Sequence, residues 1–258
     1  MSWPLVILSV LTVVSQGKPE LQQPEREISQ VVDMVVARVD KRIVTLSELL
    51  AETRLVLLRQ SGPARARVAS IDRELLSAVL RNILARNLLL SEARRLNLRP
   101  LSSEPLQDAL RSIRKLFQSR DEYVRFLERF GFEVGPEALQ MASAPLPPLL
   151  VSIIRAELEV ERFISLRINS SLVISEDEIR TCYEQQAKFL GGQSFEEARP
   201  RLMESIRRIR GERRLIRMVN QLSEKAEMIF TDNFKLEGPL LDPKRASEDF
   251  GLKCLAPE

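Results

Sequence analysis

Paired carboxylates are the residues of this sequence whose types and spacing could most directly do chemistry. They occur at Glu176-Asp177-Glu178 and again at Glu196-Glu197. Two neighbouring carboxyl groups can act as a general acid and a general base. Both groups follow a serine at the expected start of a helix, however, where acidic side chains interact favourably with the helix dipole. We therefore interpret them as helix-start charges and expect that the protein is not an enzyme.

The absence of histidine narrows the possible chemistry further. None of the 258 residues is a histidine, which removes Ser-His-Asp and Cys-His nucleophile systems and the commonest metal ligand. Cys182 and Cys254 have no second cysteine or histidine at ligand spacing, so we expect no metal site. One sequence cannot show whether these two cysteines pair, and we favour unpaired thiols. Glycine-rich phosphate-binding motifs are missing as well, so we expect no cofactor.

A group of arginines near the end of the chain could bind an anionic partner. Its members share one helical face: Arg207, Arg210, Arg214 and Arg217. Such a face could contact phosphate, anionic lipid or acidic polypeptide segments. The alternative is a solvated face opposite an apolar stripe. We favour the alternative and expect no nucleic-acid partner, because 39 basic and 36 acidic residues leave a net charge of only +3.

Repeated helix-start signals identify the elements that carry these side chains. Capping boxes, in which a hydroxyl residue is followed three positions later by Glu, begin at Thr45, Ser119, Ser175 and Ser194. Each box leads into apolar residues at helical spacing. The chain is 44% hydrophobic with only 9 glycines, which also favours helices. The longest expected helices cover residues 46–60, 71–96, 103–117, 149–168 and 195–223.

Two β-like runs stand alone at opposite ends of this helical region. The first, VVARVDKRIVT, has a turn at Asp40-Lys41, and the second lies within Glu224 to Asp232. Lone strands are unstable because their backbone N–H and C=O groups need partners. We therefore predict that Met34–Val39 pairs with Glu227–Phe230. The expected fold class is mainly α, with a helical core and a small β-sheet formed by the N-terminal and C-terminal strands.

The start of the chain has the pattern of an export signal. An apolar run extends from Trp3 to Val14, which fits a signal peptide better than a membrane span of about 20 residues. No Lys or Arg precedes the run and no clean cleavage motif follows it, so a buried N-terminal helix is the alternative. We expect a signal peptide over residues 1–17 and a linker over 18–31. The expected location is periplasmic or secreted, with no stable membrane insertion after cleavage.

Several segments follow one another in a specific order. They are the strand pair with its IVTLSEL helix, then LRNILARNLLLSEARRLNL, SRDEYVRFLERFGF, LEVERFISLRI, VISEDEIRTCYEQQ and SFEEARPRLMESIRR. Together these segments resemble the SurA family of periplasmic chaperones. The resemblance covers residues 32–232, with an N-terminal part over 32–190 and a C-terminal helix and strand over 194–232. We expect residues 233–258 to form a poorly ordered tail.

The resemblance implies an ATP-independent holdase that binds unfolded polypeptides, such as envelope or outer-membrane proteins. Many members of the family carry parvulin prolyl isomerase domains between the last two helices. Here about Gln186 to Ser194 separates these helices, and the histidine that a parvulin site uses is missing. We therefore expect the chaperone core alone, without isomerase activity. The alternative is a structural or adaptor protein that binds one specific partner through the same helical core.

Apolar residues near a proline-rich interruption are the candidate client-binding site. Pro145, Pro147 and Pro148 interrupt the helical pattern and could leave neighbouring leucines loosely packed. The candidates are Leu146, Leu149, Leu150, Ile153, Phe117 and Phe126. The aromatic residues have core spacing too, and sequence does not separate core from groove. We expect clients to bind exposed apolar surface between the helices over 71–96 and 149–168.

Overall fold

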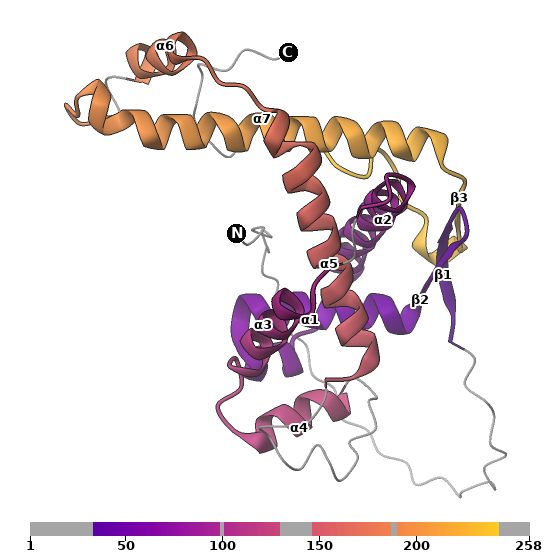
Figure 1. The fold of residues 1–258 in the computed structure, drawn as a ribbon. Coiled ribbons are helices and arrows are strands. Elements are labelled where there is room, and N and C mark those ends of the chain that lie inside the picture. The colour runs from indigo at the N-terminus through magenta and orange to yellow at the C-terminus, as the bar shows by residue number, and fades with distance from the viewer. Residues whose placement is uncertain (1–32, 99–100, 130–145, 187–189, 243–258) are drawn as a thin grey trace, which may run out of the picture. The chain divides into compact units, whose positions relative to one another are not determined.

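The computed structural model describes residues 33–98, 101–129, 146–186 and 190–242 (Figure 1). Its elements are β1 (Val35–Val39), β2 (Arg42–Thr45), α1 (Leu46–Val68), α2 (Arg73–Arg95), α3 (Ser103–Arg114), α4 (Arg120–Arg129), α5 (Pro148–Arg167), η2 (Asn169–Ser171), α6 (Glu176–Gln186), α7 (Phe195–Lys225), β3 (Met228–Phe230) and η4 (Asp232–Phe234). The prediction of a mainly helical fold with a small sheet is confirmed. The expected signal peptide and linker lie outside the described residues.

The strands form one antiparallel sheet in the order β2-β1-β3, so β1 lies in the middle. β1 pairs with β3 through Ala37 opposite Phe230 and Val39 opposite Met228. The turn between β1 and β2 places Asp40 at φ 50°, a conformation that aspartate tolerates better than most residues. The predicted pairing of the N-terminal and C-terminal strands is confirmed.

The helices begin where the capping boxes predict. In all four boxes the hydroxyl oxygen accepts the N–H of the Glu three positions later, at 3.2 to 3.4 Å. At Ser194 the box is complete, because the Glu197 side chain also accepts the Ser194 N–H. At Thr45 it is half complete: the Glu48 carboxylate binds Arg42 instead. A box can therefore start a helix while its acid serves another contact.

Gly62 divides α1 where the sequence predicts its end. Its φ of 77° and ψ of 172° are not helical, so α1 is two helical segments joined by a kink. The chain resumes helical structure after Pro63 and continues to Val68, beyond the expected end near residue 60. Proline favours the first turn of a helix because its missing N–H would have no partner there. Gly62 thus ends the first helical segment of α1, and Pro63 lies at the start of the second.

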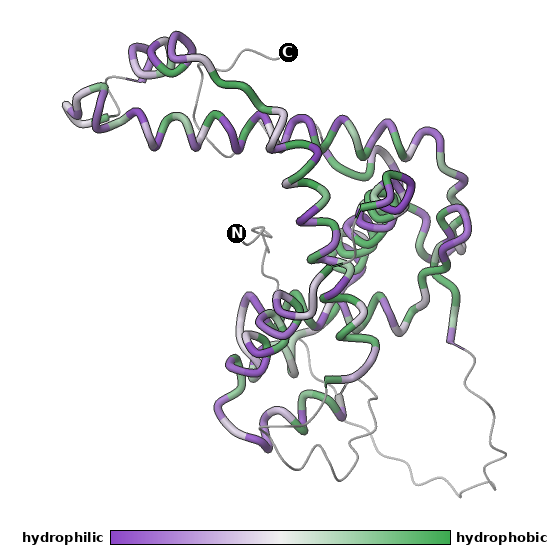
Figure 2. The backbone as a smooth tube through the Cα atoms, in the orientation of Figure 1, coloured by the Kyte–Doolittle hydropathy of each residue, from purple (hydrophilic) through white to green (hydrophobic). Residues whose placement is uncertain are grey.

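Three apolar clusters of described residues hold these elements together. The first joins the sheet to α2 and to the C-terminal halves of α5 and α7, and it includes Val36, Leu84 and Val219. The second joins α1, α3 and α4 to the N-terminal half of α5. The third joins α6 to the N-terminal half of α7 through Ile179 and Leu202. The helix α7 contributes apolar side chains to both the first and the third cluster. Figure 2 shows hydrophobic residues among hydrophilic ones along its whole length.

Candidate client-binding site

The six predicted client-binding residues lie together, but as core. All of them belong to the second cluster, where Leu149 is partly buried and the other five are buried: Phe117, Phe126, Leu146, Leu150 and Ile153. The rings of Phe117 and Phe126 meet edge to face with centroids 5.1 Å apart. These side chains therefore pack α3, α4 and α5 onto α1, and their apolar surface is not open in this structure.

The surface expected between α2 and α5 is closed as well. The two helices pack against each other along their apolar faces. Leu84 and Leu88 of α2 share the first cluster with Val160 and Phe163 of α5, and all four are buried. The expectation of exposed apolar surface between these helices is wrong, because the periodicity that marks an apolar face does not show whether a neighbour already covers it.

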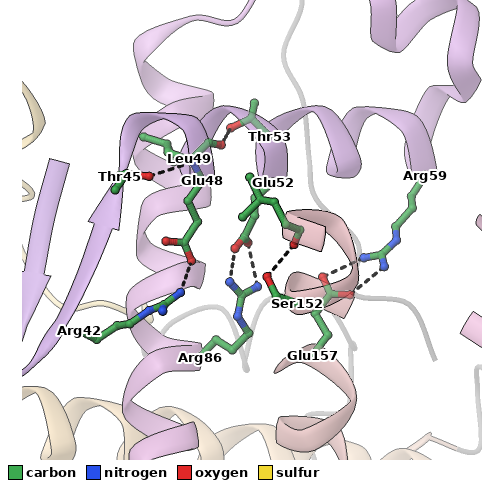
Figure 3. Close-up of polar contacts among 11 residues, drawn as sticks. Arg42, Thr45, Glu48, Leu49, Glu52, Thr53, Arg59, Arg86, Ser152 and Glu157 are labelled. Carbon is green, nitrogen blue, oxygen red and sulfur yellow. Dashed lines mark hydrogen bonds and ion pairs between the residues drawn. The ribbon is translucent and has the colours of Figure 1, made fainter. Parts of the chain in front are cut away.

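A buried ion pair joins α1 to α2 within this core. The Glu52 carboxylate accepts two bonds from the Arg86 guanidinium, one of them 2.8 Å long, and the side chains are 7% and 11% exposed. Burial raises the pKa of Glu52, and the charge of Arg86 opposes that effect. Figure 3 shows that α1 is also tied to β2 by Arg42–Glu48 and to α5 by Arg59–Glu157. These pairs hold α1 in register with three elements.

The segment after β3 is bound along its main chain. We define the C-terminal strap as residues 235–242. The guanidinium of Arg81 on α2 donates to the carbonyls of Glu237 at 2.5 Å and of Pro239 at 2.6 Å. The Asn220 side chain on α7 donates to the Leu241 carbonyl at 3.1 Å and accepts the Leu241 N–H at 3.4 Å. The main chain of the strap is thus held by side chains of two helices.

Apolar side chains of the strap complete its attachment. Leu240 and Leu241 are each 6% exposed and belong to the first cluster, and Leu236 packs against it. Residues 233–242 therefore differ from the poorly ordered tail expected over 233–258, of which 243–258 lie outside the described residues. Sequence reasoning missed Arg81 and Asn220 because both sit among ordinary helical residues. The adjacent apolar pair Leu240-Leu241 was the available signal.

The outer face of the sheet carries exposed apolar side chains. Ile43, Arg38 and Ile229 lie opposite one another across the three strands. Ile43 is 48% exposed and Ile229 is 50% exposed, and Met34 and Val35 at the start of β1 are exposed too. Along a strand, alternate side chains point to opposite faces. This face is therefore the solvent side of the sheet, where the two isoleucines lie on either side of Arg38 and Arg38 binds the Glu227 carboxylate at 2.7 Å.

Two of the predicted arginines hold α7 to its neighbours. Arg210 binds the Glu178 carboxylate of α6 and donates to the Val173 carbonyl at 3.2 Å. Arg214 donates to the Ser171 hydroxyl at 2.8 Å. The Arg210 pair and a backbone hydrogen bond from Ser175 lower the pKa of Glu178. Two arginines of the face that could have bound external anions therefore bind groups of the same chain instead.

Cys182 corrects one expectation. It is buried in the third cluster and disulfide-bonded, so the expectation of an unpaired thiol is wrong for this residue. Cys254, the other cysteine of the sequence, lies outside the described residues. Across the described ranges, no group of three or more His, Cys, Asp and Glu residues could hold a metal ion. None of the helices in these ranges is both long and apolar enough to cross a bilayer.

Comparisons with known proteins add no family to these observations. A scan against models of protein families and a search of curated proteins found no match. The resemblance to the SurA family thus rests on the sequence segments alone and stays a prediction.

Proposed function

We propose that the protein is an ATP-independent exported chaperone, a holdase, that binds unfolded polypeptides such as those of the envelope or outer membrane. The observation that carries the proposal is the C-terminal strap, whose main chain is bound by Arg81 and Asn220 while its leucines are buried. An unfolded client offers the same groups: apolar side chains and main-chain donors and acceptors without partners. A surface that binds one such segment has the chemistry to bind others.

The driving force for client binding is burial of apolar side chains. Each fully buried leucine-sized side chain contributes about 1.5–3 kcal/mol. Ordering the client offsets much of this gain, so we expect micromolar affinity and broad selectivity. Burial needs no nucleotide, and bonds to the main chain do not depend on client sequence. The protein should therefore act on many clients and in the absence of ATP.

Export is supported by two independent features. The apolar run from Trp3 to Val14 has the length of a signal-peptide core. Cys182 is disulfide-bonded, and disulfides persist in the periplasm and outside cells but are rare in the cytosol. A periplasmic or secreted location accounts for both features.

An aggregation assay with several unrelated unfolded substrates tests the proposal. The purified protein should slow aggregation of each substrate at near-stoichiometric ratios, equally with and without ATP. It should not accelerate proline-limited refolding, because residues 186–194 leave no room for an isomerase domain. Failure to slow aggregation of any substrate would remove the holdase function.

The second candidate is an adaptor that binds one folded partner. The outer face of the sheet favours this alternative, because the exposed side chains of Ile43 and Ile229 lie on either side of Arg38 and a folded partner could cover both. An adaptor would retain one stoichiometric partner in a pull-down from the native host. Ile43→Arg with Ile229→Arg should abolish that retention and leave aggregation suppression unchanged.

A further inference from the structure

The strap-binding surface recognises main chain rather than a particular sequence. Asn220 forms a reciprocal pair with the N–H and C=O of Leu241, the geometry that a neighbouring β-strand would offer. The Arg81 guanidinium donates to two carbonyls of the strap. A guanidinium presents its donors in a fixed planar fork and keeps its charge at any physiological pH. Any polypeptide with a similar backbone path could form these bonds.

The apolar part of the surface selects side chains by hydrophobicity and size. Leu240 and Leu241 enter the first cluster beside α2 and α7, whereas Glu237, Gly238 and Pro239 remain exposed. Gly238, at φ 76°, lets the main chain turn between Leu236 and the buried pair. The surface therefore accepts two adjacent apolar side chains and leaves the preceding residues in solvent. Adjacent apolar residues are common in unfolded polypeptides and are normally buried in folded ones.

We propose that the strap-binding surface, formed by Arg81, Asn220 and the apolar cluster beside them, is the client-binding site, and that the strap is its resident occupant. This inference rests on the proposed holdase function. A client segment with two adjacent large apolar residues displaces the strap and takes over its bonds to Arg81 and Asn220. The strap keeps the apolar surface covered when no client is present.

The tether sets how strongly the strap competes. The strap follows β3 and η4 directly, so it remains close to its surface when it detaches, at an effective concentration of millimolar order. If the free segment binds with an affinity near 100 μM, the tethered strap lowers client affinity by about tenfold. Releasing the strap should recover that factor.

Peptide binding to full-length variants tests the inference. The probe is a fluorescently labelled peptide with the sequence of Lys235 to Asp242, KLEGPLLD. Leu240→Asp with Leu241→Asp releases the strap, and this variant should bind the probe about tenfold more tightly than the native chain. Adding Asn220→Ala should remove the gain, whereas adding Gln221→Ala, at the exposed neighbouring position on α7, should keep it. Equal probe binding by all of these chains would overturn the inference.

A second measurement uses the native chain, so its result does not depend on whether the variants fold. A permanently unfolded, reduced and alkylated protein is added in excess, and amide hydrogen exchange is followed at Leu241. Exchange there should accelerate at least tenfold because the client removes the Asn220 acceptor. Unchanged exchange at Leu241 with client bound would overturn the inference.

Aggregation assays separate this inference from the function on which it rests. Asn220→Ala with Arg81→Ala should lose most aggregation suppression. If that variant suppresses aggregation as well as the native chain, clients bind elsewhere: the site is wrong and the holdase function stands. If the native chain suppresses no aggregation while the released variant binds the probe, the surface holds the strap alone, and both proposals fail.

Discussion

Asp40 and Glu227 join the two ends of the fold through a reciprocal pair of hydrogen bonds. The Asp40 N–H donates to the Glu227 carbonyl at 2.8 Å, and the Asp40 carboxylate accepts the Glu227 N–H at 3.0 Å across 187 positions of sequence. Asp40 occupies the turn between β1 and β2, so its side chain lies beside the start of β3. One short side chain thereby fixes the register of β3 against β1.

Removing this side chain should weaken the closure of the sheet. Asp40→Ala deletes the acceptor of the Glu227 N–H and should lower the free energy of unfolding by about 1–2 kcal/mol. Asp40→Asn keeps an acceptor and tolerates the positive φ, so its loss should stay below about 0.5 kcal/mol. Urea denaturation measures both values. Equal losses for the two variants would show that the side-chain bond does not contribute.

The buried pair of Glu52 and Arg86 should respond asymmetrically to substitution. Glu52→Ala leaves a buried guanidinium without its charge partner and should cost about 3–5 kcal/mol. Glu52→Leu combined with Arg86→Met replaces both charges by apolar groups and should be close to neutral. Urea denaturation of the single and double variants provides the comparison. A double variant as unstable as the single one would assign the loss to packing instead of charge.

The contact of Glu178 with Arg210 should make the attachment of α6 depend on pH. Arg210 and the Ser175 N–H lower the Glu178 pKa below its ordinary value of 4.5. A lowered carboxyl pKa adds stability above the unfolded value, and this stability is lost as pH falls through the folded value. Because the Glu178 side chain is 36% exposed, we expect under about 1 kcal/mol.

Glu178→Gln should therefore reduce the loss of stability between about pH 5 and pH 3. Hydrogen exchange of α6 amides, measured across this range, is the readout. Arg210→Gln should have the same effect, since it removes the other half of the pair. An unchanged pH profile in both variants would contradict this assignment.

Reduction of the Cys182 disulfide should loosen the third cluster. A native disulfide typically contributes about 2–4 kcal/mol, so dithiothreitol should lower the thermal midpoint of the native chain. Cys182→Ala cannot form the bond, and its midpoint should be the same with and without reductant. A native midpoint that ignores reductant would mean that the bond does not stabilise the fold.

Sequence reasoning recovered features that depend on local chemistry. The Ser194 capping box and the interruption of the first helix just after residue 60 follow from a few neighbouring residues. The pairing of β1 with β3 is long-range, yet it was predictable because each strand had no other partner for its backbone groups. These features required no knowledge of how the helices pack.

Features that depend on packing were missed. Phe126 and Leu150 have the apolar character of a binding surface, but burial depends on neighbours that periodicity does not identify. The Cys182 bond depends on chain path, which spacing in the sequence does not reveal. The bonds of Arg81 to the strap join residues that are 156 and 158 positions apart in the sequence. No local sequence pattern identifies a main-chain carbonyl that will accept such a bond.

The position of β3 near the end of the chain also governs when the fold can form. During synthesis β1 leaves the ribosome long before its partner, because Asp40 and Glu227 are 187 positions apart. At about 5–20 residues per second, the interval is roughly 10–40 s. The three-stranded sheet therefore cannot close until β3 has been made, and the helices between β2 and β3 lack their final contacts during this interval. This delay suits the export proposed above, because a sheet that closes late leaves the chain unfolded during its synthesis.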